Sequence, residues 1–255
     1  MIVDVLRHPT AADLAEAVAG RLVTTLVERV GDTGIAHLCL TGGGIGTAVL
    51  QALHGIPAVD AVDWPRVHVW WGDERFLPQG DPDRNETGAR AALLDHIAIP
   101  ADNIHAMPTP ASSGESVDVG ADLYAGELAA HASPGLLVPA MDILLLGIGP
   151  DAHVASLFPE LPAVHDERPV AGVHGAPKPP PLRITLTFPT IHSARQVWIL
   201  ASGREKAAAV RLALMPGAGA WQVPAAGARG SERTLFLLDQ EAAEELPVDL
   251  GRPSA

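Results

Sequence analysis

The sequence predicts an α/β fold built on an open, doubly wound and mostly parallel sheet with helices on both faces. Apolar runs of strand length alternate with helix-like segments almost throughout the chain, which is typical of a parallel sheet that is covered on both sides. We expect about six or seven strands, fewer than the eight that a closed barrel of this class requires. Because we find neither an internal repeat nor a linker, residues 1–255 are expected to form a single domain.

Composition and charge narrow the class of protein. The chain has 17 Lys and Arg against 30 Asp and Glu, a net charge of −13, which argues against general nucleic-acid or anionic-membrane binding. An anionic substrate would therefore need a few local cations. The single Cys39 excludes an intramolecular disulfide. No apolar run approaches the ~20 residues of a membrane span and the N-terminus lacks a signal-peptide pattern, so we expect a cytoplasmic protein.

The individual elements follow from local patterns. Thr10 and Asp13 have the spacing of a capping box, and apolar residues at every fourth position predict a helix that Gly31 ends. The segment 159–181 is expected to be a long irregular connection, and 216–230 a loop. Strands are predicted at 2–6, 35–40, 67–71, 143–146, 183–188, 196–201 and 234–238. Further helices are predicted from the glycine loop at 42–46 through 53, and at 86–97, 117–131 and 207–215.

The stretch 143–159 is the one around which the expected site is organised. It is predicted to be a buried strand, a sharp turn at Gly147 and Gly149, and a short helix that Asp151 caps and Pro159 ends. Ligands of open α/β sheets bind beyond the carboxyl ends of the strands. His153 is therefore a candidate general acid or base, with a purely structural role for it and a simple capping role for Asp151 as the alternatives.

A glycine-rich loop follows the second predicted strand. Thr41, Gly42, Gly43 and Gly44 lie between a strand and a helix, where bare backbone N–H groups and a helix N-terminus can cradle a phosphate. The alternative is a tight turn without a ligand. The segment 147–152 matches G-x-G-x-x-A only superficially, because Asp151 would direct a negative charge toward the expected pyrophosphate.

Charged residues follow other strands at the same edge. Asp73, Glu74 and Arg75 could orient hydroxyls and stabilise an oxyanion, or form a solvated turn. Arg183 and Lys206 would supply the local cations if the fold brings them to the glycine loop. Neither Ser156 nor Ser202 lies in a nucleophile elbow, and the eleven histidines show no zinc-ligand spacing, so we expect no metal.

These pieces together resemble the 6-phosphogluconolactonases of the glucosamine-6-phosphate isomerase/deaminase-like superfamily, from about Thr10 to Leu238. The resemblance rests on five ordered motifs, at 41–44, 71–75, 81–85, 147–159 and 183–187. The Asp-Glu-Arg triplet and the Ala-Ser-Leu-Phe-Pro segment favour the lactonase branch over the deaminase branch.

The chain departs from the usual pattern of the family at several positions. Gly44 stands where a hydroxyl-bearing residue is usual, and Thr47 is a possible replacement for that hydroxyl. Ala152 and Val154 flank the histidine in place of Gly and Thr, so the backbone at 152 has to accommodate a Cβ. Arg84 occupies a position where the family often has Ser.

The resemblance implies hydrolysis of 6-phospho-D-glucono-1,5-lactone to 6-phospho-D-gluconate in the oxidative pentose phosphate pathway, without a cofactor. His153 would take a proton from water, Arg75 would stabilise the oxyanion, and Asp151 would hold the imidazole or a sugar hydroxyl. The substrate, a sugar phosphate, would be bound by Thr41, Gly42, Gly43, Gly44, Asp73, Asn85, Arg183 and Lys206. The alternatives are a sugar-phosphate isomerase or deaminase, a non-catalytic sugar-phosphate sensor and a dinucleotide-dependent oxidoreductase.

Overall fold

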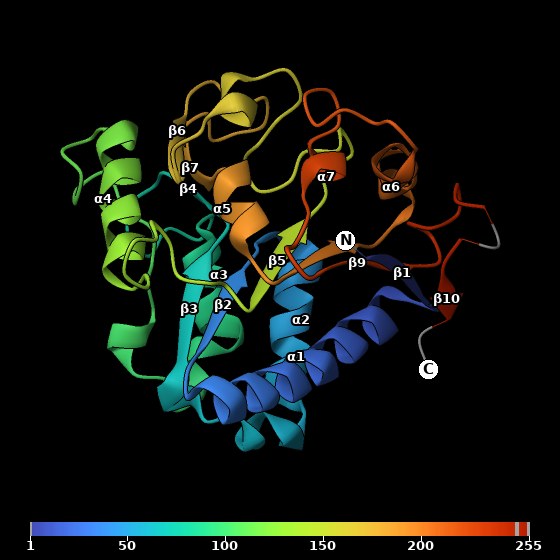
Figure 1. The fold of residues 1–255 in the computed structure, drawn as a ribbon, viewed down its shortest axis with the longest axis horizontal. Coiled ribbons are helices and arrows are strands. Elements are labelled where there is room, and N and C mark those ends of the chain that lie inside the picture. The colour runs from blue at the N-terminus through green and yellow to red at the C-terminus, as the bar shows by residue number, and fades with distance from the viewer. Residues whose placement is uncertain (1, 248–249, 254–255) are drawn as a thin grey trace.

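A parallel sheet forms the centre of the molecule, as the computed structural model shows for residues 2–247 and 250–253 (Figure 1). Its strand order within this described part is β10-β1-β9-β8-β5-β2-β3, and every neighbouring pair is parallel. The strands are β1 (Ile2–His8), β2 (Ala36–Leu40), β3 (Val67–Trp71), β5 (Ile143–Gly147), β8 (Gln196–Ala201), β9 (Arg233–Asp239) and β10 (Arg252–Pro253). The predicted open, mostly parallel sheet is confirmed.

Helices cover both faces of this sheet. In Figure 1, α1 and α2 lie together on one side, and α5, α6 and α7 lie on the other. The α-helices are α1 (Ala11–Thr33), α2 (Gly43–Gly55), α3 (Asn85–Ala92), α4 (Val117–Ala130), α5 (Phe188–Ser193), α6 (Ala207–Leu214) and α7 (Pro224–Gly227). Short 3₁₀ turns lie at Pro57–Ala61, Trp64–Arg66, Leu94–His96, Ala101–Asn103, Pro162–His165 and Arg204–Lys206. Among the described residues, none of the helices has the length and hydropathy needed to cross a membrane.

The order of the strands creates a crevice between β2 and β5. From β2 the chain moves outward to β3, then returns to the other side of β2 and continues through β5, β8 and β9. Loops that leave β2 and β5 therefore run in opposite directions. Ligand sites in open α/β sheets form at such a reversal, beyond the carboxyl ends of the strands.

A second, antiparallel sheet lies beside this crevice, and the sequence did not predict it. It consists of β4 (Asp73–Arg75), β7 (Arg183–Leu186) and β6 (Val170–Val173), and α4 packs on it. The charged triplet is thus a short strand and not a solvated turn, and the 159–181 connection contains a strand. The prediction was wrong here because β4 acquires its pairing partner from residues 183–185, far along the chain.

The helix ends differ from the predictions in detail. Thr10 caps α1 as expected, with its hydroxyl accepting a bond from the Asp13 N–H. Gly31 lies within the helix, and Gly34 ends it in a left-handed conformation, φ 80°, with its N–H bonded to the Val30 carbonyl. The predicted helix at 86–97 splits into α3 and a 3₁₀ turn, and α5 and α7 were not anticipated.

Replacement of Gly31 by alanine should stabilise the protein. Gly31 is exposed and helical, and an added Cβ would meet no described atom within 4 Å, so the change should raise the free energy of unfolding by about 0.5–1 kcal/mol. Urea denaturation measures this. Gly34→Ala is the matched comparison and should destabilise, because alanine disfavours the left-handed conformation. Equal effects at the two positions would contradict the assigned helix end.

Candidate active site

The predicted site residues converge on one pocket of about 390 Å³ at the carboxyl ends of β2, β5 and β8. This volume is in the range of small-molecule sites. Its lining includes the predicted Thr41, Gly42, Gly43, Gly44, Asp73, Arg75, Asn85, His153, Arg183 and Lys206. Asp151 stands behind His153 and contacts that ring. The fold therefore brings together residues that are up to 165 positions apart in the sequence.

The turn after β5 is not followed by the predicted helix. In this fully described segment, the N–H of Gly149 binds the His153 carbonyl and the N–H of Ala152 binds the Gly149 carbonyl. Ala152 and Ala155 adopt positive φ values of 65° and 49°, which a right-handed helix does not allow. The local signals for a helix N-terminus were overridden because this turn is held by tertiary contacts, including a bond from the Ser156 N–H to Thr185 Oγ1.

Asp151 orients the imidazole of His153 and does not cap a helix. The Asp151 Oδ1 lies 2.5 Å from His153 Nδ1, so Nδ1–H donates to the carboxylate and Nε2 keeps its lone pair. Burial raises the pKa of Asp151, but the hydrogen bond and charge of His153 and the charge of Lys178 outweigh it and bring the pKa to about 2. The carboxylate thus stays ionised at any pH above about 2, and the ring's tautomer is fixed.

Gly149 makes room for this pair. A Cβ at position 149 would lie 2.0 Å from His153 Nδ1 and 2.3 Å from Asp151 Oδ1. The ring of Phe158 packs against the imidazole with 4.5 Å between centroids. The two departures that flank His153, Ala152 and Val154, are both buried, and neither is among the described residues that line the pocket.

Glu74 fixes the neighbouring wall of the pocket. Its carboxylate accepts the N–H groups of Arg75, Asn85 and Glu86, and so holds the N-terminus of α3. Burial raises the pKa of Glu74, and Arg84 and these N–H donors oppose that rise. Arg84, itself fully buried, lies 3.9 Å from Glu74. The role of Glu74 is thus to position Arg75 and the N-terminus of α3.

Asn85 is held between the Asp-Glu-Arg strand and the glycine loop. Its Nδ2 donates to the Asp73 carbonyl at 2.8 Å, and its Oδ1 accepts from Arg75 Nη1 at 2.9 Å. A Cβ on Gly42 would lie 1.9 Å from Asn85 Oδ1. Glycine at position 42 is therefore required by the approach of this amide, in addition to any role of the loop in binding an anion.

The glycine loop joins β2 to the turn after β5. Thr41 Oγ1 accepts the N–H of Gly147 at 3.1 Å, and α2 begins at Gly43 with its N-terminus beside the pocket. At Gly44 an added Cβ would meet no described atom within 4 Å. Thr47 lies one turn further along α2 and lines a hollow that Gly42, Gly43 and Gly44 also line.

Arg183 comes from the antiparallel sheet and not from the main sheet. Its guanidinium donates to the carbonyls of Lys178, Pro179 and Pro180 at 3.0–3.2 Å and lies 3.8 Å from Asp73 Oδ2. Burial lowers its pKa, and Asp73 opposes this. Arg183 therefore holds the segment that carries Lys178 over the pocket.

Lys178 was missed as a site residue. It lines the pocket, and its Nζ lies 3.9 Å from Asp151 Oδ1. The sequence did contain a signal, because Lys178 and Lys206 are its only lysines, and both line this pocket. Burial lowers the pKa of Lys206, and the charge of Glu205 opposes this.

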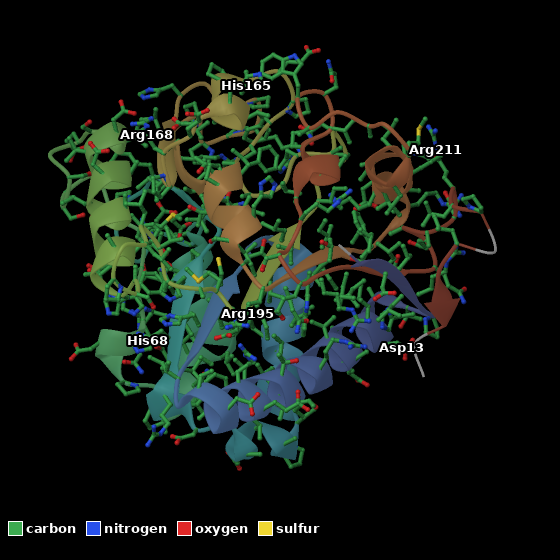
Figure 2. All side chains as sticks on the ribbon, in the orientation of Figure 1. Asp13, His68, His165, Arg168, Arg195 and Arg211 are labelled. Atoms are coloured by element: carbon green, nitrogen blue, oxygen red, sulfur yellow. The ribbon has the colours of Figure 1, made fainter. Side chains whose placement is uncertain are left out.

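Several arginines elsewhere on the surface are paired with acids. Arg168 and Arg211, labelled in Figure 2, lie 2.7 Å from Asp166 and 2.9 Å from Glu245. The pocket therefore concentrates positive charge in an otherwise acidic protein. Together with an imidazole that a carboxylate orients, it suits an anionic substrate.

This fold and site define an α/β protein with a pocket for an anionic substrate at the carboxyl ends of its strands, and the comparisons with known proteins identify the family. The family model described as glucosamine-6-phosphate isomerases/6-phosphogluconolactonase matches residues 9–236. The chain belongs to this family.

Three similar proteins are named as lactonases. A 6-phosphogluconolactonase of Streptomyces coelicolor is 54% identical, over 95% of this chain and 94% of the relative. One of Mycobacterium tuberculosis is 46% identical, over 92% and 96%. The solved structure of the Trypanosoma brucei 6-phosphogluconolactonase is 29% identical with a TM-score of 0.80, and the match covers 96% of this chain and 99% of that one.

Replacement of Gly149 by alanine should abolish most activity without unfolding the protein. The new Cβ would displace the His153–Asp151 pair, so turnover should fall by about 100-fold or more. Gly147→Ala is the matched control, since its Cβ would meet Thr41 Oγ1 at an ordinary 3.7 Å. Steady-state kinetics with circular dichroism would test both variants. Full activity in Gly149→Ala would contradict the described geometry.

Proposed function

We propose that the chain hydrolyses 6-phospho-D-glucono-1,5-lactone to 6-phospho-D-gluconate, with His153 as the general base. The observation that carries the catalytic assignment is the Asp151–His153 contact of 2.5 Å at the edge of the pocket. The names of the relatives at 54% and 46% identity support the substrate. Cytoplasmic location fits such a reaction and is part of the proposal.

The phosphate group of the substrate binds at the N-terminus of α2. The backbone N–H groups after Gly42 and the positive end of the helix dipole attract an anion there. Lys206 lines the same pocket and supplies a charged donor. Arg183, whose donors already bind backbone carbonyls, contributes by fixing the Lys178 segment and by its positive charge.

The chemical step needs no covalent intermediate with the protein, because a lactone is already an activated ester. His153 Nε2 removes a proton from water, and the oxygen attacks the lactone carbonyl carbon. Arg75 stabilises the resulting oxyanion while Asn85 and the Asp83 carbonyl hold its guanidinium. The carbon–oxygen bond of the ring then breaks, and protonated His153 returns the proton to the departing ring oxygen. Asp151 stabilises the imidazolium that forms between these steps.

The alternatives are less well supported by the site. A dinucleotide would place its pyrophosphate at a helix N-terminus after Gly149, but the chain forms no helix between Gly149 and Pro159, all of which are described. A sensor would bind the sugar phosphate without needing an oriented base. The isomerase and deaminase branch belongs to the same family, and the names of the relatives favour the lactonase branch.

Removal of the base should abolish most of the turnover. We expect His153→Ala to lower kcat by about 10²–10⁴-fold. A glucose-6-phosphate dehydrogenase would generate the lactone in situ, with a chelator present, and its disappearance would be compared with the spontaneous rate. His96→Ala, an exposed histidine outside the pocket, should retain full activity. If the wild type does not accelerate the reaction, or releases ammonia from glucosamine 6-phosphate instead, the proposed function is wrong.

Removal of the Lys206 charge should act on binding. Lys206→Met should raise KM by about 10–100-fold, the loss expected for one charged hydrogen bond, with a smaller effect on kcat. Arg204→Met is the matched control, since Arg204 lies on the same 3₁₀ turn but pairs with Glu244 at the surface. An unchanged KM in Lys206→Met would remove this lysine from the phosphate site.

A further inference from the structure

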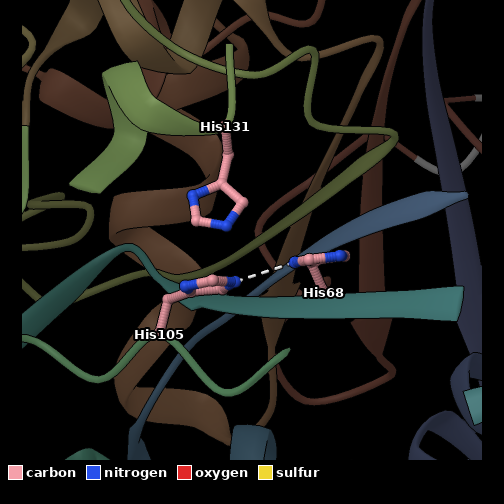
Figure 3. Close-up of side chains that lie close together, drawn as sticks. All are labelled: His68, His105 and His131. Atoms are coloured by element: carbon pink, nitrogen blue, oxygen red, sulfur yellow. Dashed lines mark hydrogen bonds between the residues drawn. The ribbon is translucent and has the colours of Figure 1, made fainter. Parts of the chain in front are cut away.

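Three histidines gather on the side of β3 away from the catalytic pocket. His68 lies near the start of β3, His105 follows the 3₁₀ turn at Ala101–Asn103, and His131 is the C-cap residue of α4. One ring nitrogen from each lies within 4.8 Å of the others. In Figure 3 the His131 ring stands over the His68–His105 pair. Of the described residues that line the pocket, none belongs to this cluster.

The ring of His105 is oriented as in a metal ligand. Its Nδ1 lies 2.8 Å from Glu127 Oε1, so Nδ1–H donates to the carboxylate and the lone pair is on Nε2. Histidine ligands almost always donate their second N–H to such a partner, which also makes them more basic. The indole of Trp70 stacks on the ring at 3.8 Å with 9° between planes, which holds it in this position.

The other two rings each place a nitrogen within 4.8 Å of the His105 nitrogen. His68 Nδ1 lies 2.8 Å from His105 Nε2. His131 Nδ1 lies 3.0 Å from the Glu127 carbonyl and donates to it, which leaves the lone pair of Nε2. Two nitrogen ligands at a tetrahedral angle, each about 2.0–2.1 Å from zinc, are about 3.3 Å apart. The distance between His68 Nδ1 and His105 Nε2 therefore has to increase by only about half an ångström.

The burial of the cluster favours neutral rings. His105 is buried, and His68 and His131 are partly buried. Neutral imidazoles are the form that binds metals. His131 is exposed enough, with 29% of its side chain accessible, to give an ion a path from solvent.

We propose that His68, His105 and His131 bind one divalent transition-metal ion of the zinc class, with Glu127 as the outer carboxylate and water as the fourth ligand. His68 then carries its proton on Nε2, and its Nδ1 coordinates. Three imidazoles with borderline-soft nitrogen donors select zinc, cobalt, nickel or copper over magnesium and calcium. The ion links β3, the segment after Asn103 and α4, and it lies outside the pocket proposed for lactone hydrolysis.

The neighbouring His37 is not a fourth ligand. Trp70 Nε1 donates to His37 Nδ1 at 3.1 Å, so the remaining nitrogen carries the proton. The centroid of the His37 ring lies 5.2 Å from the centroid of the His68 ring. The earlier expectation of no metal rested on sequence spacing. His68 and His105 are 37 residues apart, so no short motif could reveal the cluster.

Zinc binding to the purified full-length protein tests the proposal. After treatment with a chelator and its removal, ZnCl₂ would be titrated by calorimetry, and native mass spectrometry would count the ions bound. We expect one tight site per chain and a rise in Tm with zinc. Co²⁺ in place of zinc should give the intense visible bands of a tetrahedral site. Absence of a tight site would overturn the proposal.

Substitutions locate the ion. His131→Ala should weaken zinc binding by at least about 10-fold, and Glu127→Gln, on a half-exposed side chain, by about 10–100-fold. His96→Ala and His153→Ala should leave zinc binding unchanged. His96 is the matched control, because it stacks on His54 in a pair of histidines that has no third ring. Zinc that persists in His131→Ala, or is lost in His153→Ala, would show that the ion binds elsewhere. Lactone hydrolysis by His131→Ala should equal that of the wild type with or without zinc.

Discussion

The buried carboxylates of Asp73 and Glu74 are the contacts on which the rest of the site depends. Glu74 accepts three backbone N–H groups and thereby joins the strand after β3 to the start of α3. Asp73 accepts the hydroxyl of Ser156 at 2.6 Å and faces Arg183, which joins the same strand to the turn after β5 and to β7. A buried carboxylate is costly unless it is fully hydrogen-bonded, so each of these segments has to be in its place. The segments that form the walls of the pocket are therefore positioned by the same group of buried contacts.

Close approach is the second constraint, and two glycines permit it. Gly42 lies under the Asn85 amide, and Gly149 lies under the His153–Asp151 pair. In both cases the Cβ of a substituted residue would overlap a polar atom of the site. The glycines of the two turns thus serve the placement of side chains as much as the freedom of the backbone.

Charge is distributed to suit an anionic substrate in an acidic protein. The overall charge is −13, yet both lysines of the chain and Arg183 line the same pocket. Asp151 balances this locally, since it stays ionised beside His153 and Lys178. The histidine cluster behind β3 is the second concentration of ionisable groups, and its nitrogens face one another instead of solvent (Figure 3). The cations that line the pocket and the clustered imidazoles are thus two separate groups of ionisable side chains.

Local patterns in the sequence predicted the parallel α/β class, the Thr10 helix cap and the two glycine turns, because periodicity, capping and turn chemistry act over a few residues. The resemblance to a known family added residues such as Asn85 to the ten predicted residues that line the pocket. The sequence by itself did not determine the antiparallel sheet, the form of the turn after β5, the place of Lys178 or the histidine cluster. Each of these depends on partners distant in the chain: β4 on β7, Ser156 on Asp73, the Lys178 segment on Arg183, and His68 on His105. The capping signal at Asp151 was overridden because the turn that contains it is fixed by long-range bonds, such as that of Ser156 to Asp73. Only the tertiary structure decides between such competing partners, because burial makes the long-range hydrogen bond obligatory.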